Sequence, residues 1–219
     1  GTEKDIIIDN CTFIDNIAGV DTSQKYYGGA VFFDTCNTKI KKPELITFSK
    51  CTFRNNTSPN GDGYAMYISD LPDTEIKITD KTIFEDNGFA EKNDDFTSVV
   101  IDSKILTIEL STFTHKNSDY SSRDLEVYSE TFSVTNTLFQ NSTNGLLNKA
   151  NAIWIREKVL TSQIDNCNFI DCGNLRGDVI RSETRELIFD KSTIKFNHHN
   201  GTRGIYIDYP SKLYVLQSH

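Results

Sequence analysis

The sequence lacks the features that mark several protein classes. No stretch approaches the roughly 18 consecutive apolar residues of a transmembrane helix. No window sustains apolar residues at positions i, i+3, i+4 and i+7, so we expect no long amphipathic helix. The 219 residues include only 4 prolines, and they contain no low-complexity tract. These absences exclude a membrane-spanning helix within this sequence and leave short strands as the expected local structure.

A basic surface is also missing. The formal net charge is -8, and no face rich in Lys and Arg is visible, so we expect no nucleic-acid partner. The sequence has no Gly-rich phosphate loop and no nucleophile elbow. His115 and the pair His198 and His199 lie three repeats apart, roughly 14 Å at strand spacing, which is too far for one zinc site. We therefore predict neither a cofactor nor a metal site.

What the sequence does have is a motif that recurs seven times. The clearest copies run over 6–16 and 46–56, with alternating apolar residues, a short polar pair, a Phe, and an Asn three residues later. The copies follow one another at intervals of roughly 25 to 40 residues, which is typical of solenoids and repeat arrays. Their central residues are Phe13, Phe53, Phe84, Phe113, Phe139, Phe169 and Ile194.

Each copy has a second half, a short run rich in β-branched and aromatic residues that ends at Gly, Asn, Asp or Ser, as strands do. A propeller blade needs four strands in about 40 residues, and these repeats are too short for that. We therefore predict an all-β fold, a right-handed parallel β-helix of about seven turns with a pectin-lyase-like architecture. Residues 1–219 should form a single domain, and because a solenoid needs caps, we expect it to be a segment of a longer protein.

Stacked turns predict columns of like side chains. The Phe column should form a buried aromatic stack. An Asn column should lie at a corner, where Asn tolerates the left-handed conformation and amides can bond from turn to turn. That column departs from Asn near Lys116, Ser142 and Cys172, so turns four to six should be less regular. The members of the Asn column are Asn16, Asn56, Asn87 and Asn197.

A resemblance to a known family rests on two of these motifs. Phe13-Ile-Asp-Asn16-Ile-Ala18 followed by Gly28-Gly-Ala-Val31 resembles the paired FxxN and GGA(I/L/V) repeats of the chlamydial polymorphic membrane proteins, and similar repeats occur in surface proteins of trichomonad-like protists. The FxxN half recurs at 53–56 and 84–87, whereas the GGA half is intact only once. The resemblance implies a parallel β-helix exposed at the cell surface and acting in adhesion.

The cysteines and glycosylation sequons bear on location. The 5 cysteines are an odd number, which means at least one free thiol, or an intermolecular bond if the chain is extracellular. Cys11, Cys51 and Cys167 share a slot for small side chains with Ser111, Thr137 and Ser192. We expect Cys11 and Cys51 to be reduced core residues, whereas Cys167 and Cys172 flank one short strand and are the candidate disulfide. Sequons hint at a secreted eukaryotic glycoprotein, and they begin at Asn10, Asn55, Asn56, Asn141 and Asn200.

One row of the second strands should face outward. Aligning the strands puts Val31, Met66, Val99, Leu125, Ile153, Val179 and Ile205 in an inward column. By the period of two, the next positions point out, and these are Phe32, Tyr67, Val100, Glu126, Trp154, Ile180 and Tyr206. Exposed Phe32, Tyr67, Trp154 and Tyr206 would form a stacking surface for sugars or a partner protein. Alternatively, loops or another chain cover this row.

A candidate acidic row follows at the strand ends, with Asp34, Asp70, Asp102 and Asp208 as its members. Carboxylates on adjacent turns are how polysaccharide lyases and glycoside hydrolases of this architecture build their sites. Here the acidic positions drift by a residue or two, and like charges repel unless a cation such as calcium intervenes. Strand-end Asp and Glu are also the ordinary residues of solvated corners. We therefore predict no catalytic residues.

The expected function is that of a non-catalytic β-helix module, at the cell surface or secreted, in adhesion, ligand binding or scaffolding. Its expected partners are a host or neighbouring-protein surface or a glycan, with end-to-end or lateral self-assembly as a further candidate. Two alternatives stay open: a polysaccharide-active enzyme on the same scaffold, and a fibre or assembly scaffold without a ligand of its own.

Overall fold

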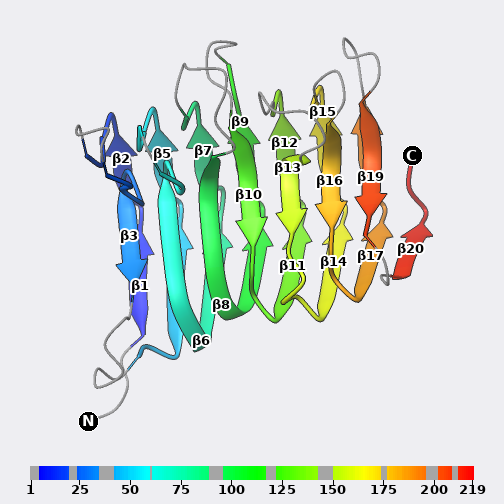
Figure 1. The fold of residues 1–219 in the computed structure, drawn as a ribbon, viewed down its shortest axis with the longest axis horizontal. Helices are drawn as coiled ribbons and strands as arrows, with labels where there is room; N and C mark the ends of the chain where they lie inside the picture. The colour runs from blue at the N-terminus through cyan, green and yellow to red at the C-terminus, as the bar shows by residue number, and fades with distance from the viewer. Residues whose placement is uncertain are drawn as a thin grey trace.

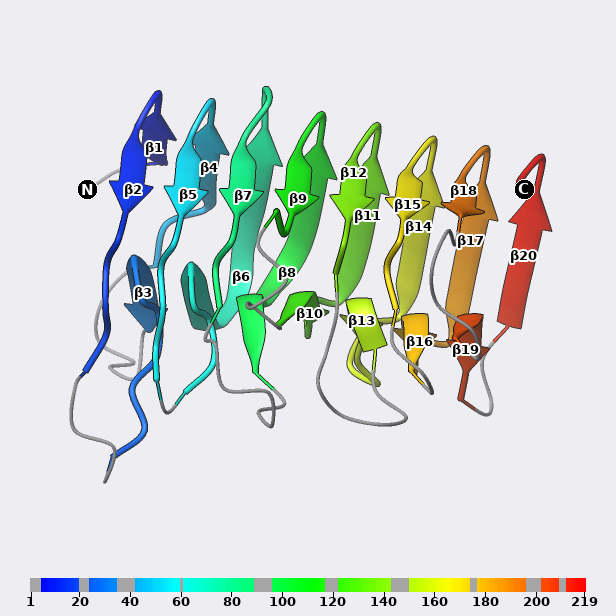
Figure 2. The same cartoon turned by 90° about the horizontal axis from the view of Figure 1, so that it is seen from above.

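The computed structural model describes residues 5–19, 24–34, 42–59, 61–88, 96–116, 122–142, 150–173, 177–195, 202–208 and 212–219. Within these residues every regular element is a β-strand and none is a helix. The strands form a parallel β-solenoid of about five turns (Figure 1). The two chain ends lie at opposite ends of the stack (Figure 2).

The strands fall into three columns, and successive sequence repeats contribute successive strands to each column. The first column consists of β1 (Ile6–Asp9), β4 (Leu45–Ser49), the second half of β6 (Met66–Thr79), the second half of β8 (Thr97–Glu109), β11 (Thr131–Thr135), β14 (Thr161–Asp165), β17 (Glu186–Asp190) and β20 (Lys212–Leu216). The second column consists of β2 (Thr12–Ile14), β5 (Thr52–Arg54), β7 (Ile83–Glu85), β9 (Thr112–Thr114), β12 (Leu138–Gln140), β15 (Asn168–Ile170) and β18 (Thr193–Lys195). The third column consists of β3 (Val31–Asp34), the first halves of β6 and β8, β10 (Arg123–Val127), β13 (Ala150–Ile155), β16 (Asp178–Ser182) and β19 (Arg203–Ile207).

A stack of five phenylalanine rings fills the interior behind the second column. Phe53, Phe84, Phe113, Phe139 and Phe169 are all buried, and successive rings lie 4.6 to 4.9 Å apart with nearly parallel planes. This distance is the spacing of neighbouring strands, because parallel pairing in register places the same position of each repeat directly over the last. The predicted aromatic column is confirmed.

The end rungs of this column are less enclosed. Phe13 stacks on Phe53 at 4.7 Å but is only half-buried, and so is Ile194. The second column thus holds one strand from each of the seven sequence copies, while only the five middle rungs bury their aromatic residue completely. The solenoid has about five turns, fewer than the seven predicted.

The corners are made by residues in the left-handed conformation. They follow the first-column and second-column strands, with φ between 45° and 67°. After the first column they are Asn10, Lys50, Asp80, Lys81, Leu110, Asn136, Asn166, Lys191 and Gln217, and after the second Asp15, Asn55, Asp86, Asn141 and Asp171. The sequence predicted this conformation for Asn16, Asn56 and Asn87. The left-handed residue is in fact the one before each Asn, because the chain bends before the Asn side chain points inward.

The Asn column instead forms a hydrogen-bond ladder. The Nδ2 of Asn16 donates to the Oδ1 of Asn56, and the Nδ2 of Asn56 donates to the Oδ1 of Asn87, each at 2.8 Å. The backbone amides of Asn16 and Asn56 donate to the same two oxygens at 3.1 Å. The predicted ladder is confirmed for these three residues, and Asn197 lies outside the described part of the chain.

Small side chains line the neighbouring slot as predicted. The hydroxyls of Ser111 and Thr137 and the thiol of Cys167 each donate to the backbone carbonyl two residues earlier, at 2.9 to 3.3 Å. The backbone amide of Cys167 then donates to the hydroxyl of Ser192 on the next turn, at 3.0 Å. The slot therefore favours a small side chain that can both donate and accept a hydrogen bond. This explains why Ser, Thr and Cys occupy it in different turns.

Replacing Phe84 by Ala should lower the free energy of unfolding by about 3 to 5 kcal/mol, because it leaves a cavity between two stacked rings. Chemical denaturation measures the change. The matched control is Phe32→Ala, since Phe32 is 53% exposed, and its cost should stay under about 1 kcal/mol. Equal losses for the two variants would contradict the buried stack.

Replacing Leu110 by Asn should raise the free energy of unfolding by about 1 kcal/mol, because Asn tolerates the left-handed backbone better than Leu does. The control is Leu160→Asn, which changes an equally exposed Leu whose φ is not positive and should be nearly neutral. The same denaturation experiment compares both. A destabilised Leu110→Asn variant would show that apolar contacts outweigh the backbone strain.

Candidate functional site

The outward residues of the third column lie in one continuous row. The cross-strand pairs run Phe32 to Tyr67, Tyr67 to Val100, Val100 to Glu126, Glu126 to Trp154, Trp154 to Arg181, and Arg181 to Tyr206. We call these seven residues the outward row. It crosses the face drawn in front in Figure 1, and it contains the four aromatic residues predicted from the sequence.

One member of the row differs from the prediction. Ile153 pairs with Ile180, and Trp154 pairs with Arg181, because β13 carries an extra residue between Ala150 and Ile153. Ile180 is therefore fully buried, whereas the sequence alignment placed it in the outward row and put Val179 in the inward column. A bulge of this kind shifts the register without changing the residue pattern, so counting by the period of two misses it.

The C-terminal half of the row is covered by the chain's own arginines. Trp154 is only 7% exposed, with the Arg156 guanidinium 3.9 Å and the Arg123 guanidinium 4.4 Å from its ring centroid. Its indole Nε1 donates to the Oε1 of Glu183 at 2.9 Å. The expectation that Trp154 offers an exposed stacking surface is wrong, because cation–π contacts and a hydrogen bond already occupy it.

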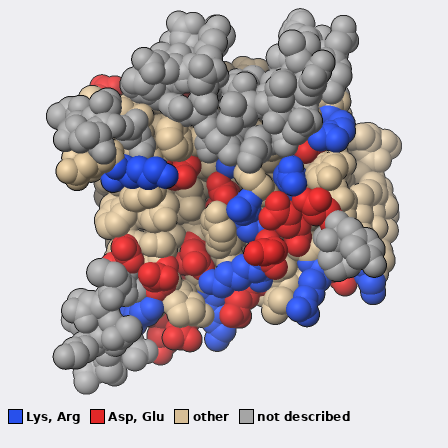
Figure 3. Space-filling view, viewed as in Figure 1, with Lys and Arg blue, Asp and Glu red and all other residues tan. Residues whose placement is uncertain are grey.

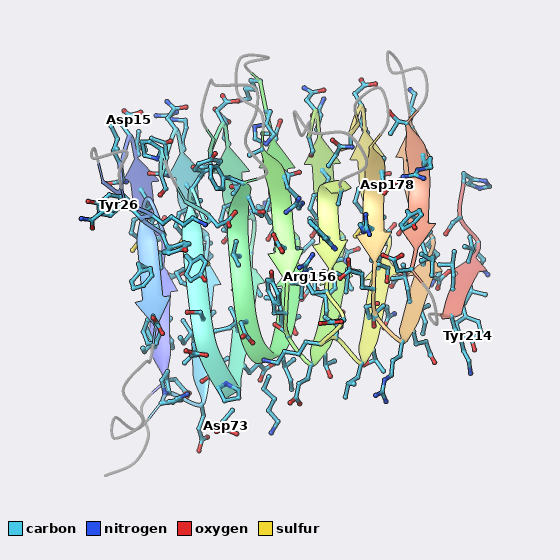
Figure 4. The ribbon with its side chains drawn as sticks, viewed as in Figure 1. Asp15, Tyr26, Asp73, Arg156, Asp178 and Tyr214 are labelled. Atoms are coloured by element: carbon cyan, nitrogen blue, oxygen red, sulfur yellow. The ribbon has the colours of Figure 1, made fainter. Side chains whose placement is uncertain are left out.

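Tyr206 is half-buried in a similar way. Arg181 and Arg203 lie 5.0 and 4.7 Å from its ring centroid. The Nη2 of Arg181 is 2.7 Å from a carboxylate oxygen of Asp208, and the Nε of Arg203 is 2.6 Å from one of Asp178. Each guanidinium thus covers a ring and binds a carboxylate at the same time. Acidic and basic side chains mingle over the middle of this face (Figure 3), and Arg156 lies near its centre (Figure 4).

Arg123 is the most deeply buried charge of this network. Its side chain is fully buried, and its Nη1 donates to Glu126 at 2.7 Å and to the hydroxyl of Thr97 at 2.9 Å. The other oxygen of Glu126 accepts the hydroxyl of Tyr128 at 2.7 Å. Burial, followed by the neighbouring Glu126, raises the pKa of Tyr128, so this phenol stays protonated and keeps donating. A buried Arg is tolerated because its charge is paired and hydrogen-bonded.

The N-terminal half of the row is different. Phe32 is 53% exposed and Tyr67 is half-buried. The Tyr67 ring stacks against Phe32, with 5.9 Å between the ring centroids, and packs at a tilt of 37° against Tyr27, with 4.6 Å between the centroids. We call Tyr27, Phe32 and Tyr67 the aromatic patch. The Tyr27 and Phe32 rings both pack against the Tyr67 ring. Among the described residues, no Lys or Arg lies over them.

A hollow of about 180 Å³ adjoins the aromatic patch. Tyr67 and Tyr128 line it together with the carboxylates of Asp62, Asp102 and Glu126. Val100, which also lines it, lies between Tyr67 and Glu126 in the outward row. Burial raises the pKa of Tyr67, and the neighbouring Tyr27, Asp62, Asp34 and Asp102 raise it further. The hollow therefore combines aromatic surface with carboxylates, of which Asp102 and Glu126 are ion-paired.

The candidate acidic row is only partly a row. Asp34 pairs with Ser69, so Asp70 lies one residue beyond the register, exposed and in the left-handed conformation at the bend of β6. Asp102 forms an ion pair with Lys158, and Asp208 forms one with Arg181. These pairs neutralise two of the four carboxylates.

The four described cysteines are free. The thiol of Cys167 donates to backbone carbonyls of Val134 and Asp165, and the thiol of Cys172 contacts the hydroxyl of Ser142 at 3.4 Å. The candidate disulfide between Cys167 and Cys172 is not formed. The three extended residues of β15 between them span about 10 Å, whereas a disulfide needs Cα atoms within about 7 Å. Cys36 lies outside the described residues.

The sequons differ in the accessibility of their amides. Asn10 is exposed at a corner. Asn55 donates its Nδ2 to Asp15, and Asn141 donates its Nδ2 to the carbonyl of His115. Asn56 is fully buried in the amide ladder, and Asn200 lies outside the described residues. Among the four described sequons, Asn10 is therefore the most suitable acceptor for a glycan.

A buried polar cluster was missed by the sequence analysis. The Nε2 of His115 lies 2.9 Å from an oxygen of Asp124, and the hydroxyl of Ser142 donates to the other oxygen. Burial raises the pKa of Asp124. The departure from Asn at Lys116, Ser142 and Cys172 signalled an irregular region, but Asp124 comes from a different column, which the repeat pattern does not reveal. The cluster is enclosed, so it serves as an interior hydrogen-bond network where the Asn ladder stops.

The described residues lack two further kinds of site. They contain no group of three or more His, Cys, Asp or Glu side chains placed to hold a metal ion. They also contain no helix long and apolar enough to cross a membrane.

Comparison with known proteins identifies no relative. The chain matches no family model, no curated protein and no solved structure. The resemblance to the FxxN and GGA repeats therefore rests on the short motifs alone, and what the structure establishes is the parallel β-solenoid.

Alkylation of the native protein should distinguish the cysteines by the reactivity of their thiols. Burial raises the pKa of Cys167 and Cys172 to about 12, so at pH 8 only about one thiol in ten thousand is a reactive thiolate. We expect iodoacetamide to modify partly exposed Cys11 first and to leave Cys51, Cys167 and Cys172 unmodified, as read by peptide mass spectrometry. Unfolding in guanidinium should make all of them react, and fast labelling of native Cys167 would contradict its burial.

Proposed function

We propose that this chain is a non-catalytic module of a cell-surface or secreted protein, and that it binds a ligand through the aromatic patch and the adjoining hollow. The proposal includes the finer fold assignment, a right-handed parallel β-helix of pectin-lyase-like architecture, as the usual handedness of parallel crossovers favours. Adhesion is the role that fits a rigid rod with one ligand-binding face.

The observation that carries the proposal is the contrast within the outward row. Trp154 and Tyr206 are covered by arginines, whereas Phe32 and Tyr67 present their rings beside a hollow. Supported aromatic rings next to polar groups are typical of recognition surfaces, because they bury apolar area at little cost in side-chain entropy. The strands that carry them are held on a stacked core, so the surface is preorganised.

The polar groups of this face support binding over catalysis. Asp102 is paired with Lys158, Asp208 with Arg181, and Glu126 with Arg123 and Arg156. A glycosidase needs two carboxylates aimed at one bond, and a lyase needs a group that takes a proton. Ion-paired carboxylates on this face are instead fixed acceptors for hydrogen bonds from a ligand.

The test is a binding survey with matched variants. The wild-type chain, Tyr67→Ala and Tyr214→Ala are applied to a glycan array and to a panel of extracellular proteins. Tyr214 is 44% exposed on β20 in the first column, so its variant removes a similar ring far from the hollow (Figure 4). We expect saturable binding by the wild type, a loss of about 2 kcal/mol for Tyr67→Ala, and no change for Tyr214→Ala.

Two results would refute this proposal: no saturable ligand on either array, or equal losses for the two variants. Immunolabelling of unpermeabilised cells tests the location separately. Signal only after permeabilisation would contradict the surface assignment.

A further inference from the structure

We infer that the ligand of the aromatic patch and hollow is an arginine side chain in a basic segment of a partner protein. This inference rests on the proposed function and names the chemical class of its ligand. The outward row already binds guanidinium groups of the chain itself.

The C-terminal half of the outward row provides the internal comparison. Arg156 lies over Trp154 at 3.9 Å and is 3.8 Å from Glu183. Arg181 lies over Tyr206 at 5.0 Å while binding Asp208. In each case an aromatic residue of the row and a carboxylate near the strand end hold one guanidinium together. Parallel strands about 4.8 Å apart place the ring and the carboxylate at the separation that a planar guanidinium can bridge.

The N-terminal half has the same two components without the cation. Phe32 and Tyr67 belong to the same row, and Asp34 lies two residues after Phe32, just as Asp208 lies two residues after Tyr206. The Asp34 carboxylate is among the neighbours that raise the pKa of Tyr67. Among the described residues, no Lys or Arg lies over either ring, and Asp34 forms no ion pair. The face thus has a ring and carboxylate arrangement for a guanidinium that the described chain does not itself supply.

The hollow has the size for such a group, and carboxylates line its wall. At about 180 Å³ it has room for a guanidinium and a few waters, since one water takes about 30 Å³. Asp102 in its wall already binds a cation. Lys158, 56 residues away in sequence, forms an ion pair with it. The net charge of -8 adds long-range attraction for a basic partner.

Arginine fits this site better than lysine does. A guanidinium stacks on a tyrosine ring with its plane and binds carboxylates through two N–H groups, whereas an ammonium is a strongly hydrated point charge. Among the described residues, the cations that cover Trp154 and Tyr206 are four arginines. A neutral glycan would use the rings and leave the charge of Asp34 unmatched, so a basic peptide is the favoured ligand.

The experiment measures fluorescence anisotropy of labelled peptides against the whole chain. Three peptides share one Gly/Ser framework and carry four Arg, four Lys or four citrulline residues. We expect the Arg peptide to bind about tenfold tighter than the Lys peptide, citrulline to abolish binding, and affinity to fall as salt rises. Equal affinity for Arg and Lys peptides would overturn the inference, because it indicates attraction by net charge alone.

Variants of the hollow test the site. Tyr67→Ala should weaken Arg-peptide binding about tenfold, and Tyr67→Phe should restore most of it because the ring remains. Asp102→Asn should also weaken binding, which covers the case in which Tyr67→Ala fails to fold. Lys158→Ala should tighten binding about threefold by freeing Asp102. The matched control is Lys191→Ala, which removes the same charge from an ion pair at the end of β17 and should change nothing.

The outcomes separate this inference from the function on which it rests. If the arrays show a neutral glycan bound through Tyr67 and the Arg peptide does not bind, the inference fails and the binding function stands. If neither the arrays nor the peptides bind, both fail. If Lys158→Ala and Lys191→Ala tighten binding equally, the effect is one of net charge and the inference fails.

Discussion

The structure depends on one constraint, the parallel pairing of strands in register from turn to turn. Pairing at strand spacing brings each residue of a turn directly over its counterpart in the next, so like side chains must form continuous columns. Apolar columns become the stacked phenylalanines, and polar ones must satisfy each other by hydrogen bonds. The Asn ladder and the Ser, Thr and Cys slot are the two solutions that this chain uses.

The same constraint produces both halves of the outward row. In its C-terminal half, arginines fill the spaces between stacked aromatic residues and carboxylates, which closes the surface and buries Arg123. In its N-terminal half, the rings remain open beside the hollow. One repeated geometry thus yields a structural network at one end and a recognition surface at the other, according to whether the turn carries its own arginine.

Much of the fold could be predicted because a solenoid converts sequence periodicity directly into spatial neighbours. The Phe column and the ladder through Asn16, Asn56 and Asn87 follow from spacing alone. Less of the candidate site could be predicted from the sequence. Phe32 and Tyr67 were placed correctly in the row, but the burial of Trp154 depends on arginines from three different turns, and the cluster around Asp124 joins two columns.

The sequence by itself determined that the strands are parallel and stacked, and which residue types share a column, because both properties depend only on the repeat and its internal period. Only the tertiary structure decided that Ile180 is buried and Arg181 faces outward, that Cys167 and Cys172 stay apart, and which rings are covered. The reason is physical. A bulge shifts register without altering periodicity, and long side chains such as Arg156 and Lys158 select partners on other turns by reach and charge, which no linear pattern encodes.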